Sequence, residues 1–123
     1  MTSFDPVART RLHLAMAEAL NPALKALISS NPDALAQAQA VAERAAHAPL
    51  TPLSGLTVSL KDNIDTAGWT TTMGSAFFRD HVPVADAPVT TRLRAAGAVI
   101  IGKANLHAVS YTHLRAHETK ANL

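Results

Sequence analysis

The four residues 98–101, Ala-Val-Ile-Ile, form an apolar run with no polar position, and Gly97 precedes them. An uninterrupted apolar strand is typical of a largely parallel sheet whose faces are both covered by helices. Glycine is also a favoured residue just after the end of a helix, so a helix before residue 97 is expected. The run therefore favours an α/β fold with packed layers.

Helix-start signals recur along the chain. In three places an Asp or Asn that could cap a helix stands next to a proline or two residues before it. The pairs are Asp5-Pro6, Asn31-Pro32-Asp33, and Asp86 with Pro88. We expect the first helix to stop at Asn21-Pro22 and the second to run to about His47. The third helix should turn Val89, Leu93 and Ala96 inward.

Two further segments have the composition of strands. Residues 56–61 alternate, with Leu56, Val58 and Leu60 on one side and polar residues on the other. Residues 23–29 form a short apolar run between breakers that fits a helix or a strand, and a strand is weakly favoured. Helices and strands thus alternate, which predicts a mixed or parallel sheet with packing helices.

Composition excludes several classes of protein. The 123 residues contain no cysteine, which removes disulfides, thiolate catalysis and Cys-based zinc sites. The net charge is +2 and the basic residues are scattered, so a nucleic-acid partner is not expected. Neither a signal peptide nor an apolar stretch of membrane-spanning length is visible, which makes a cytoplasmic protein the default.

Lys61 is the candidate for chemistry. It is the last residue of the alternating strand, on the strand's polar side, and Asp62-Asn63 follows it. Ligands of open α/β sheets bind beyond the carboxyl ends of the strands, which is where Lys61 is expected. From spacing alone, an ordinary surface lysine at a strand exit is the favoured interpretation.

The surrounding motifs resemble the amidase-signature family. Residues 52–78 read PLSGLTVSLKDNIDTAGWTTTMGSAFF and are similar to the family's PLxGxPVxxKDN and TTxGS segments. Residues 86–108 read DAPVTTRLRAAGAVIIGKANLHA and resemble its DAxxVxxLRxAGAxxxGKTNxxE segment. The sequence departs from these patterns at Thr57, Ala104 and Ala108. The resemblance covers most of residues 10–108.

The resemblance implies the N-terminal part of an amidase-signature fold and the hydrolysis of carboxylic amides by a Ser–cis-Ser–Lys triad. Lys61 would be the catalytic lysine, and a partly neutral amine would draw a proton through the bridging serine. The implied partner is a small-molecule amide. No cofactor, metal, nucleic acid or membrane is expected, and a homodimer of the longer protein stays open.

The two serines of such a triad have no counterpart here. The chain has five glycines, none adjacent to another, and no GGSSGG-like run. The chain by itself is therefore expected to be an incomplete and inactive fragment. Residues 1–108 are expected to form the N-terminal portion of the domain, and residues 109–123 look like a non-native or disordered tail.

Two other functions stay open on the same residues. One is the A subunit of a glutamyl-tRNA(Gln) amidotransferase, or an allophanate-type hydrolase, on the same scaffold. The other is a non-catalytic α/β interaction module, in which Lys61 would be exposed. Residues 97–103 match a phosphate-binding loop by letter, but Ala104 could not ligate magnesium and the segment reads as a buried strand, so Lys103 receives no role.

Overall fold

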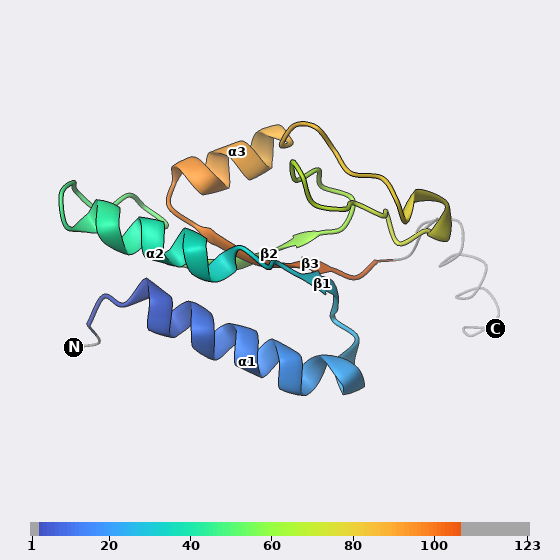
Figure 1. Ribbon diagram of the computed structural model, residues 1–123, viewed down its shortest axis with the longest axis horizontal. Helices are drawn as coiled ribbons and strands as arrows, with labels where there is room; N and C mark the ends of the chain where they lie inside the picture. Colours follow the sequence, from blue (N-terminus) through green and yellow to red (C-terminus); the bar gives the residue numbers. More distant parts are fainter. Residues whose placement is uncertain (1–2, 107–123) are drawn as a thin grey trace, which may run out of the picture.

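The computed structural model of the chain describes residues 3–106, so the predicted tail at 109–123 and the domain boundary at 108 lie outside the described residues. The elements alternate as the sequence predicts (Figure 1). They are α1 (Pro6–Leu24), β1 (Leu27–Ser30), α2 (Ala34–Ala45), β2 (Thr57–Lys61), a single-turn 3-10 helix (Ala76–Phe78), α3 (Pro88–Ala95) and β3 (Val99–Ala104).

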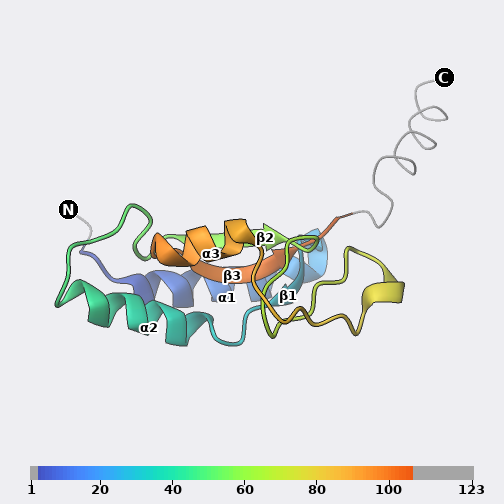
Figure 2. The same cartoon turned by 90° about the horizontal axis from the view of Figure 1, so that it is seen from above.

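The three strands form one mixed sheet in the order β1-β3-β2. β3 is central, parallel to β2 and antiparallel to β1. α1 and α3 lie on opposite sides of the sheet (Figure 1), and the view from above shows α3 over β3 (Figure 2). This confirms the α/β class with a mixed sheet and packing helices.

The start of α1 is as predicted, but its end is not. Asp5 is the N-cap, and its Oδ1 accepts a hydrogen bond from the Ala8 amide at 2.8 Å. The helix continues through Pro22 to Leu24 instead of stopping at Asn21-Pro22. Proline in the last turn removes only one backbone donor. The helix ends at Lys25, a left-handed residue whose amide donates to the Asn21 carbonyl at 2.7 Å.

The weakly favoured strand at 23–29 is only partly correct. Residues 23 and 24 belong to α1, and the strand occupies Leu27–Ser30. Asn21 connects the two elements, because its side chain accepts from the Leu27 amide at 2.8 Å and donates to the Leu27 carbonyl at 2.9 Å. An asparagine read as a breaker thus links α1 to the first strand.

The expected inner face of α3 is correct in part, because Leu93 and Ala96 are half-buried but Val89 is not. Val89 is 45% exposed, whereas Thr90 is fully buried. Thr90 donates its hydroxyl to the Asp65 carbonyl at 2.8 Å, so a polar contact with the loop after β2 sets the rotation of the helix. Apolar periodicity could not indicate this, because the buried residue is polar.

β3 is longer than the predicted run and contains an irregularity. The strand extends to Ala104, beyond the expected end at 101. Val58 pairs with Ile100 but Ser59 pairs with Gly102, so Ile101 is an extra residue on β3. A bulge of this kind redirects the side chains that follow it.

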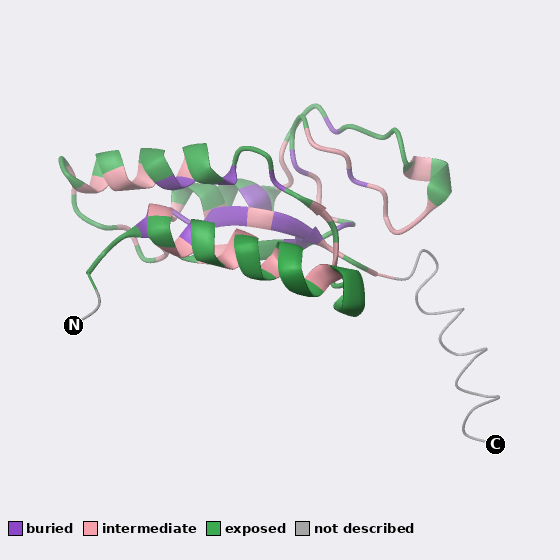
Figure 3. Cartoon of the chain, turned by 60° about the horizontal axis from the view of Figure 1, so that its bottom comes forward, coloured by how far each residue is buried: buried purple, intermediate pink, exposed green. Residues whose placement is uncertain are grey.

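The core is small and lies between β3 and the first two helices. Ala34 and Ala38 of α2 and Val99 of β3 are fully buried, with Val7, Leu14, Val41 and Ile101 packed against them. Burial concentrates on β3, while the outward faces of the helices are exposed (Figure 3). Small alanines allow α2 to approach the sheet closely. No helix among residues 3–106 is long and apolar enough to cross a membrane.

Candidate active site

Lys61 lies at the carboxyl end of β2, as the alternating pattern predicts, and it is exposed. Thr57, four residues earlier on the same strand, pairs with Val99 and contacts His13 of α1 at 2.6 Å. Because alternate residues of a strand share a face, the Lys61 side chain lies on the face of β2 that is turned toward α1. Exposure is also what the interaction-module alternative expects, so the position of Lys61 alone does not separate the two functions.

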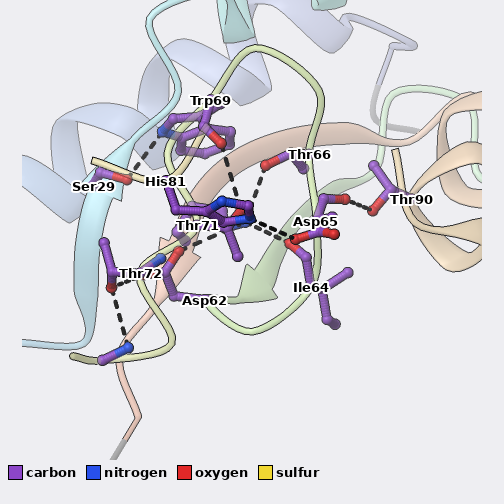
Figure 4. Close-up of polar contacts among 12 residues, drawn as sticks. Ser29, Asp62, Ile64, Asp65, Thr66, Trp69, Thr71, Thr72, His81 and Thr90 are labelled. Atoms are coloured by element: carbon purple, nitrogen blue, oxygen red, sulfur yellow. Dashed lines mark hydrogen bonds and ion pairs between the residues drawn. The ribbon is translucent and has the colours of Figure 1, made fainter. Parts of the chain in front are cut away.

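The segment 62–75, here called the KDN loop, begins directly after Lys61 and folds back over the sheet. Its first turn closes when the Ile64 amide donates to the Lys61 carbonyl at 2.9 Å. Farther along, the Trp69 indole Nε1 donates to the Ser29 hydroxyl of β1 at 3.1 Å. The loop therefore spans the sheet from edge strand β2 to the opposite edge strand β1 (Figure 4).

Lys103 is the largest fully buried side chain of the described chain and lies beneath this loop. Its Nζ donates to the Ile64 carbonyl at 2.6 Å and to the hydroxyls of Thr66 and Thr71 at 3.0 Å each. An ammonium group has three N–H donors, and these three acceptors use all of them. The Trp69 ring centroid lies 5.5 Å from the same nitrogen, within the range of a cation–π contact.

Asp62 supplies the negative charge of this cluster. Its Oδ1 lies 3.6 Å from Lys103 Nζ, and both side chains are almost completely buried. Its Oδ2 accepts hydrogen bonds from the Thr72 amide, at 3.0 Å, and from the Thr72 hydroxyl. The carboxylate thus joins the start of the KDN loop to its far end, as Figure 4 shows.

Burial lowers the pKa of Lys103 from its usual value of 10.5, because removing water disfavours the charged ammonium. The negative charge of Asp62 acts in the opposite direction, with a smaller contribution from the charge of Asp65. The surroundings of Lys103 therefore favour its neutral form more than water does.

The end of the KDN loop has an uncommon backbone. Met73 has φ +54°, a left-handed conformation seldom adopted by residues other than glycine. Its amide donates to the Asp62 carbonyl at 2.8 Å, which holds the strained residue in place. The Ser75 hydroxyl, at the end of the loop, accepts from the Phe77 amide at 3.2 Å and caps the 3-10 helix.

Sequence reasoning singled out Lys61 as the candidate and gave Lys103 no role. Leu60 pairs with Lys103 in the sheet, so Lys103 lies on the face opposite to Lys61. The bulge at Ile101 produces this orientation, and local alternation could not reveal it. The sequence did contain one signal for Lys103, because a lysine stands two residues after a buried apolar run. The letter match to a phosphate-binding loop drew attention away from it. Among the described residues, no group of three His, Asp or Glu side chains could hold a metal ion.

Comparison with known proteins identifies the family. The family model Amidase matches residues 8–116. The A subunit of the glutamyl-tRNA(Gln) amidotransferase of Methylococcus capsulatus is 43% identical over 104 residues, which are 84% of this chain and 21% of that protein. The corresponding protein of Geobacter sulfurreducens is 46% identical over 100 residues, which are 80% of this chain and 21% of that protein.

Solved structures agree with this comparison. The peptide amidase of Stenotrophomonas maltophilia superimposes with a TM-score of 0.79 at 39% identity, over 84% of this chain and 22% of that one. The A subunit of the Thermotoga maritima glutamyl-tRNA(Gln) amidotransferase gives a TM-score of 0.67 at 28% identity, over 86% of this chain and 21% of that one. The chain spans about a fifth of the length of the relatives that it matches. On the extent of the family match, the chain belongs to the Amidase family, whose members carry the amidase signature.

Proposed function

We propose that this chain is the lysine-bearing segment of an enzyme that hydrolyses carboxylic amides, with Lys61 as its catalytic lysine. The observation that carries the proposal is the place of Lys61 at the carboxyl end of β2, followed by Asp62-Asn63, within the residues that the family model matches. The peptide amidase and the amidotransferase proteins among the relatives support amide chemistry.

The chemistry requires Lys61 to be neutral for part of the time. A neutral amine accepts a proton from a bridging serine, which accepts one from the serine that attacks the amide carbonyl. The adduct then breaks its C–N bond, the leaving amine takes up that proton, and an acyl-enzyme remains. Water next attacks the acyl-enzyme, releases the carboxylic acid and returns a proton to the serine. Both serines would belong to chain beyond these 123 residues, which would also cover Lys61.

A chimera tests the role of Lys61. Residues 8–106 of this chain would replace the matched segment of the Stenotrophomonas maltophilia peptide amidase, and hydrolysis of a peptide amide would be followed by ammonia release. We expect the chimera to be active and Lys61→Ala to lower kcat at least about 100-fold, the range of a lost general base. Lys25→Ala is the matched control, because Lys25 is an exposed lysine outside the KDN loop.

The result would contradict the proposal if the Lys61→Ala chimera kept the activity of the unaltered chimera. The 123-residue chain by itself should release no ammonia, since it has no glycine- and serine-rich run to supply the nucleophile. Amide turnover by this chain that disappears in Lys61→Ala would show that the nucleophile lies within it.

The exposure of Lys61 is also compatible with one alternative, a non-catalytic interaction module. An active chimera that depends on Lys61 excludes this alternative. A distinction between a peptide amidase and an amidotransferase subunit would depend on substrate-binding regions that lie outside this chain. The proposed partner is therefore stated only as a carboxylic amide.

A further inference from the structure

We propose that Lys103 is a positioning residue for Lys61, holding the KDN loop so that the catalytic amine is presented at a fixed place beyond β2. The proposal rests on the proposed role of Lys61. The two lysines lie on opposite faces of the sheet, because Lys103 pairs with Leu60 while Lys61 pairs with Ala104. Lys103 therefore acts through the backbone and does not contact the reacting atoms.

The path from Lys103 to Lys61 is short. The Ile64 carbonyl accepts from Lys103 Nζ at 2.6 Å, and the Ile64 amide donates to the Lys61 carbonyl at 2.9 Å. Lys103 thus fixes the turn whose first residue is Lys61. The Asp62 amide also donates to the Ala104 carbonyl at 3.0 Å, which ties this turn to the strand that carries Lys103.

The same ammonium group fixes the far part of the loop. Thr71 accepts from Lys103 Nζ at 3.0 Å, and the next residue, Thr72, donates to Asp62 through its amide and hydroxyl. The Asp62 carbonyl then accepts from the left-handed Met73. Residues on both sides of the loop are therefore held by one buried ion pair.

Stability alone explains this arrangement poorly. A buried ammonium group loses its hydration, and apolar replacements of buried ion pairs are often neutral or stabilising. The methionine side chain has similar length and would avoid that loss. What methionine could not do is bind a carbonyl and two hydroxyl groups at once, and those contacts set the course of the loop.

The matched variants Thr71→Val and Thr71→Ser test the proposal. Valine keeps the shape of Thr71 and removes the hydroxyl that Lys103 binds, whereas serine keeps the hydroxyl. In the 123-residue chain, Thr71→Val should speed hydrogen exchange at the Ile64 and Met73 amides, and Thr71→Ser should not. Thr91→Val on α3 is the control, because its exposed hydroxyl bonds only the Ala87 carbonyl, at 3.3 Å.

The kinetic constants of the chimera distinguish a positioning role from a merely structural one, because a merely structural role would leave them unchanged. In Thr71→Val, kcat should fall on the order of 10-fold to 100-fold with little change in KM, as for a displaced catalytic group. The acid limb of the pH profile of kcat/KM should also move, because a looser loop displaces Lys61 from the groups that surround it in the chimera. Thr71→Ser should restore both values, and Lys103→Met should show a larger loss than Thr71→Val.

Each contrary outcome has a distinct meaning. If Lys61→Ala abolishes activity but Thr71→Val leaves kcat and the acid limb unchanged, Lys103 has no positioning role. Unchanged exchange at Ile64 and Met73 in Thr71→Val would show that the anchoring itself is wrong. If Lys61→Ala leaves the chimera active, the proposed function fails and the positioning role fails with it. Should Lys103→Met not fold, Thr66→Val removes another Lys103 contact and applies the same criteria.

Discussion

At the scale of single residues, the two lysines differ in whether water or protein groups surround the amine. Lys61 keeps its hydration at the end of β2, and Lys103 exchanges hydration for three protein acceptors and one carboxylate. In a folded chain, the second arrangement costs free energy unless every donor is satisfied. The contacts of the Lys103 ammonium group therefore depend on the KDN loop keeping its position.

The lowered pKa of Lys103 predicts a specific pH dependence of stability. Between the folded-state pKa and 10.5, the unfolded chain holds a proton that the folded chain releases, so the free energy of unfolding rises with pH. The slope from one group is at most about 1.4 kcal/mol per pH unit. The charged groups that oppose the shift are Asp62 and Asp65.

The measurement is chemical unfolding of the unaltered chain and of Lys103→Met across the alkaline range. Other titrating groups are common to both chains, so their contribution cancels in the difference between the two free energies of unfolding. The free energy of unfolding of the unaltered chain minus that of Lys103→Met should increase as the pH rises toward 10.5. A difference that is flat, or that falls with pH, would contradict the lowered pKa.

Among the elements, the connection from α3 to β3 depends on the glycine predicted to follow the helix. Gly97 has φ +90°, and a Cβ atom there would lie 2.9 Å from the Ser54 Cα. Gly68 has a similar φ of +72° but open space around it. Substitutions at the two glycines can therefore distinguish the effect of backbone conformation from the effect of packing.

We expect Gly68→Ala to destabilise the chain by about 1 kcal/mol, the cost of a left-handed backbone for a residue with a Cβ. Gly97→Ala should cost about 1–3 kcal/mol in addition, because the neighbour it meets is backbone and cannot rotate away. Urea unfolding of both variants gives the comparison. Equal losses would mean that the contact between residue 97 and residues 51–54 is looser than the structure shows.

Across the whole molecule, the central position of β3 organises residues 3–106. β3 bonds to a strand on each side, packs against α1 and α2, and carries Lys103 beneath the KDN loop. Among these described residues, the edge strands β1 and β2 each pair on one side only. β3 is mostly buried along its length, and its residues Val99, Ile100 and Lys103 are fully buried (Figure 3).

Hydrogen exchange over the described residues should reflect this arrangement. Amides of β3 should exchange most slowly, because their opening requires the sheet to separate on both sides. Amides of β2 and β1 that point away from β3 should exchange faster. Exchange of β2 as slow as that of β3 would indicate that β2 has a second neighbour in solution, such as another copy of this chain.

Much of the fold was predictable because its signals are local. Asp5-Pro6 starts a helix through its own capping geometry, and the 56–61 alternation gives a strand that ends on Lys61. The errors arose where distant contacts override local preference. Pro22 stays within α1, and Thr90 rather than Val89 faces inward because it bonds the Asp65 carbonyl.

Local pattern was sufficient to establish the α/β class, the order of elements, the family resemblance and the place of Lys61 at a strand end. The burial of Lys103 beneath the KDN loop became visible only once the chain was folded. Its acceptors lie 32 to 39 residues away along the chain, and the Ile101 bulge turns its side chain toward them. Burial of a charge depends on which distant groups surround it, and neighbours in sequence do not carry that information.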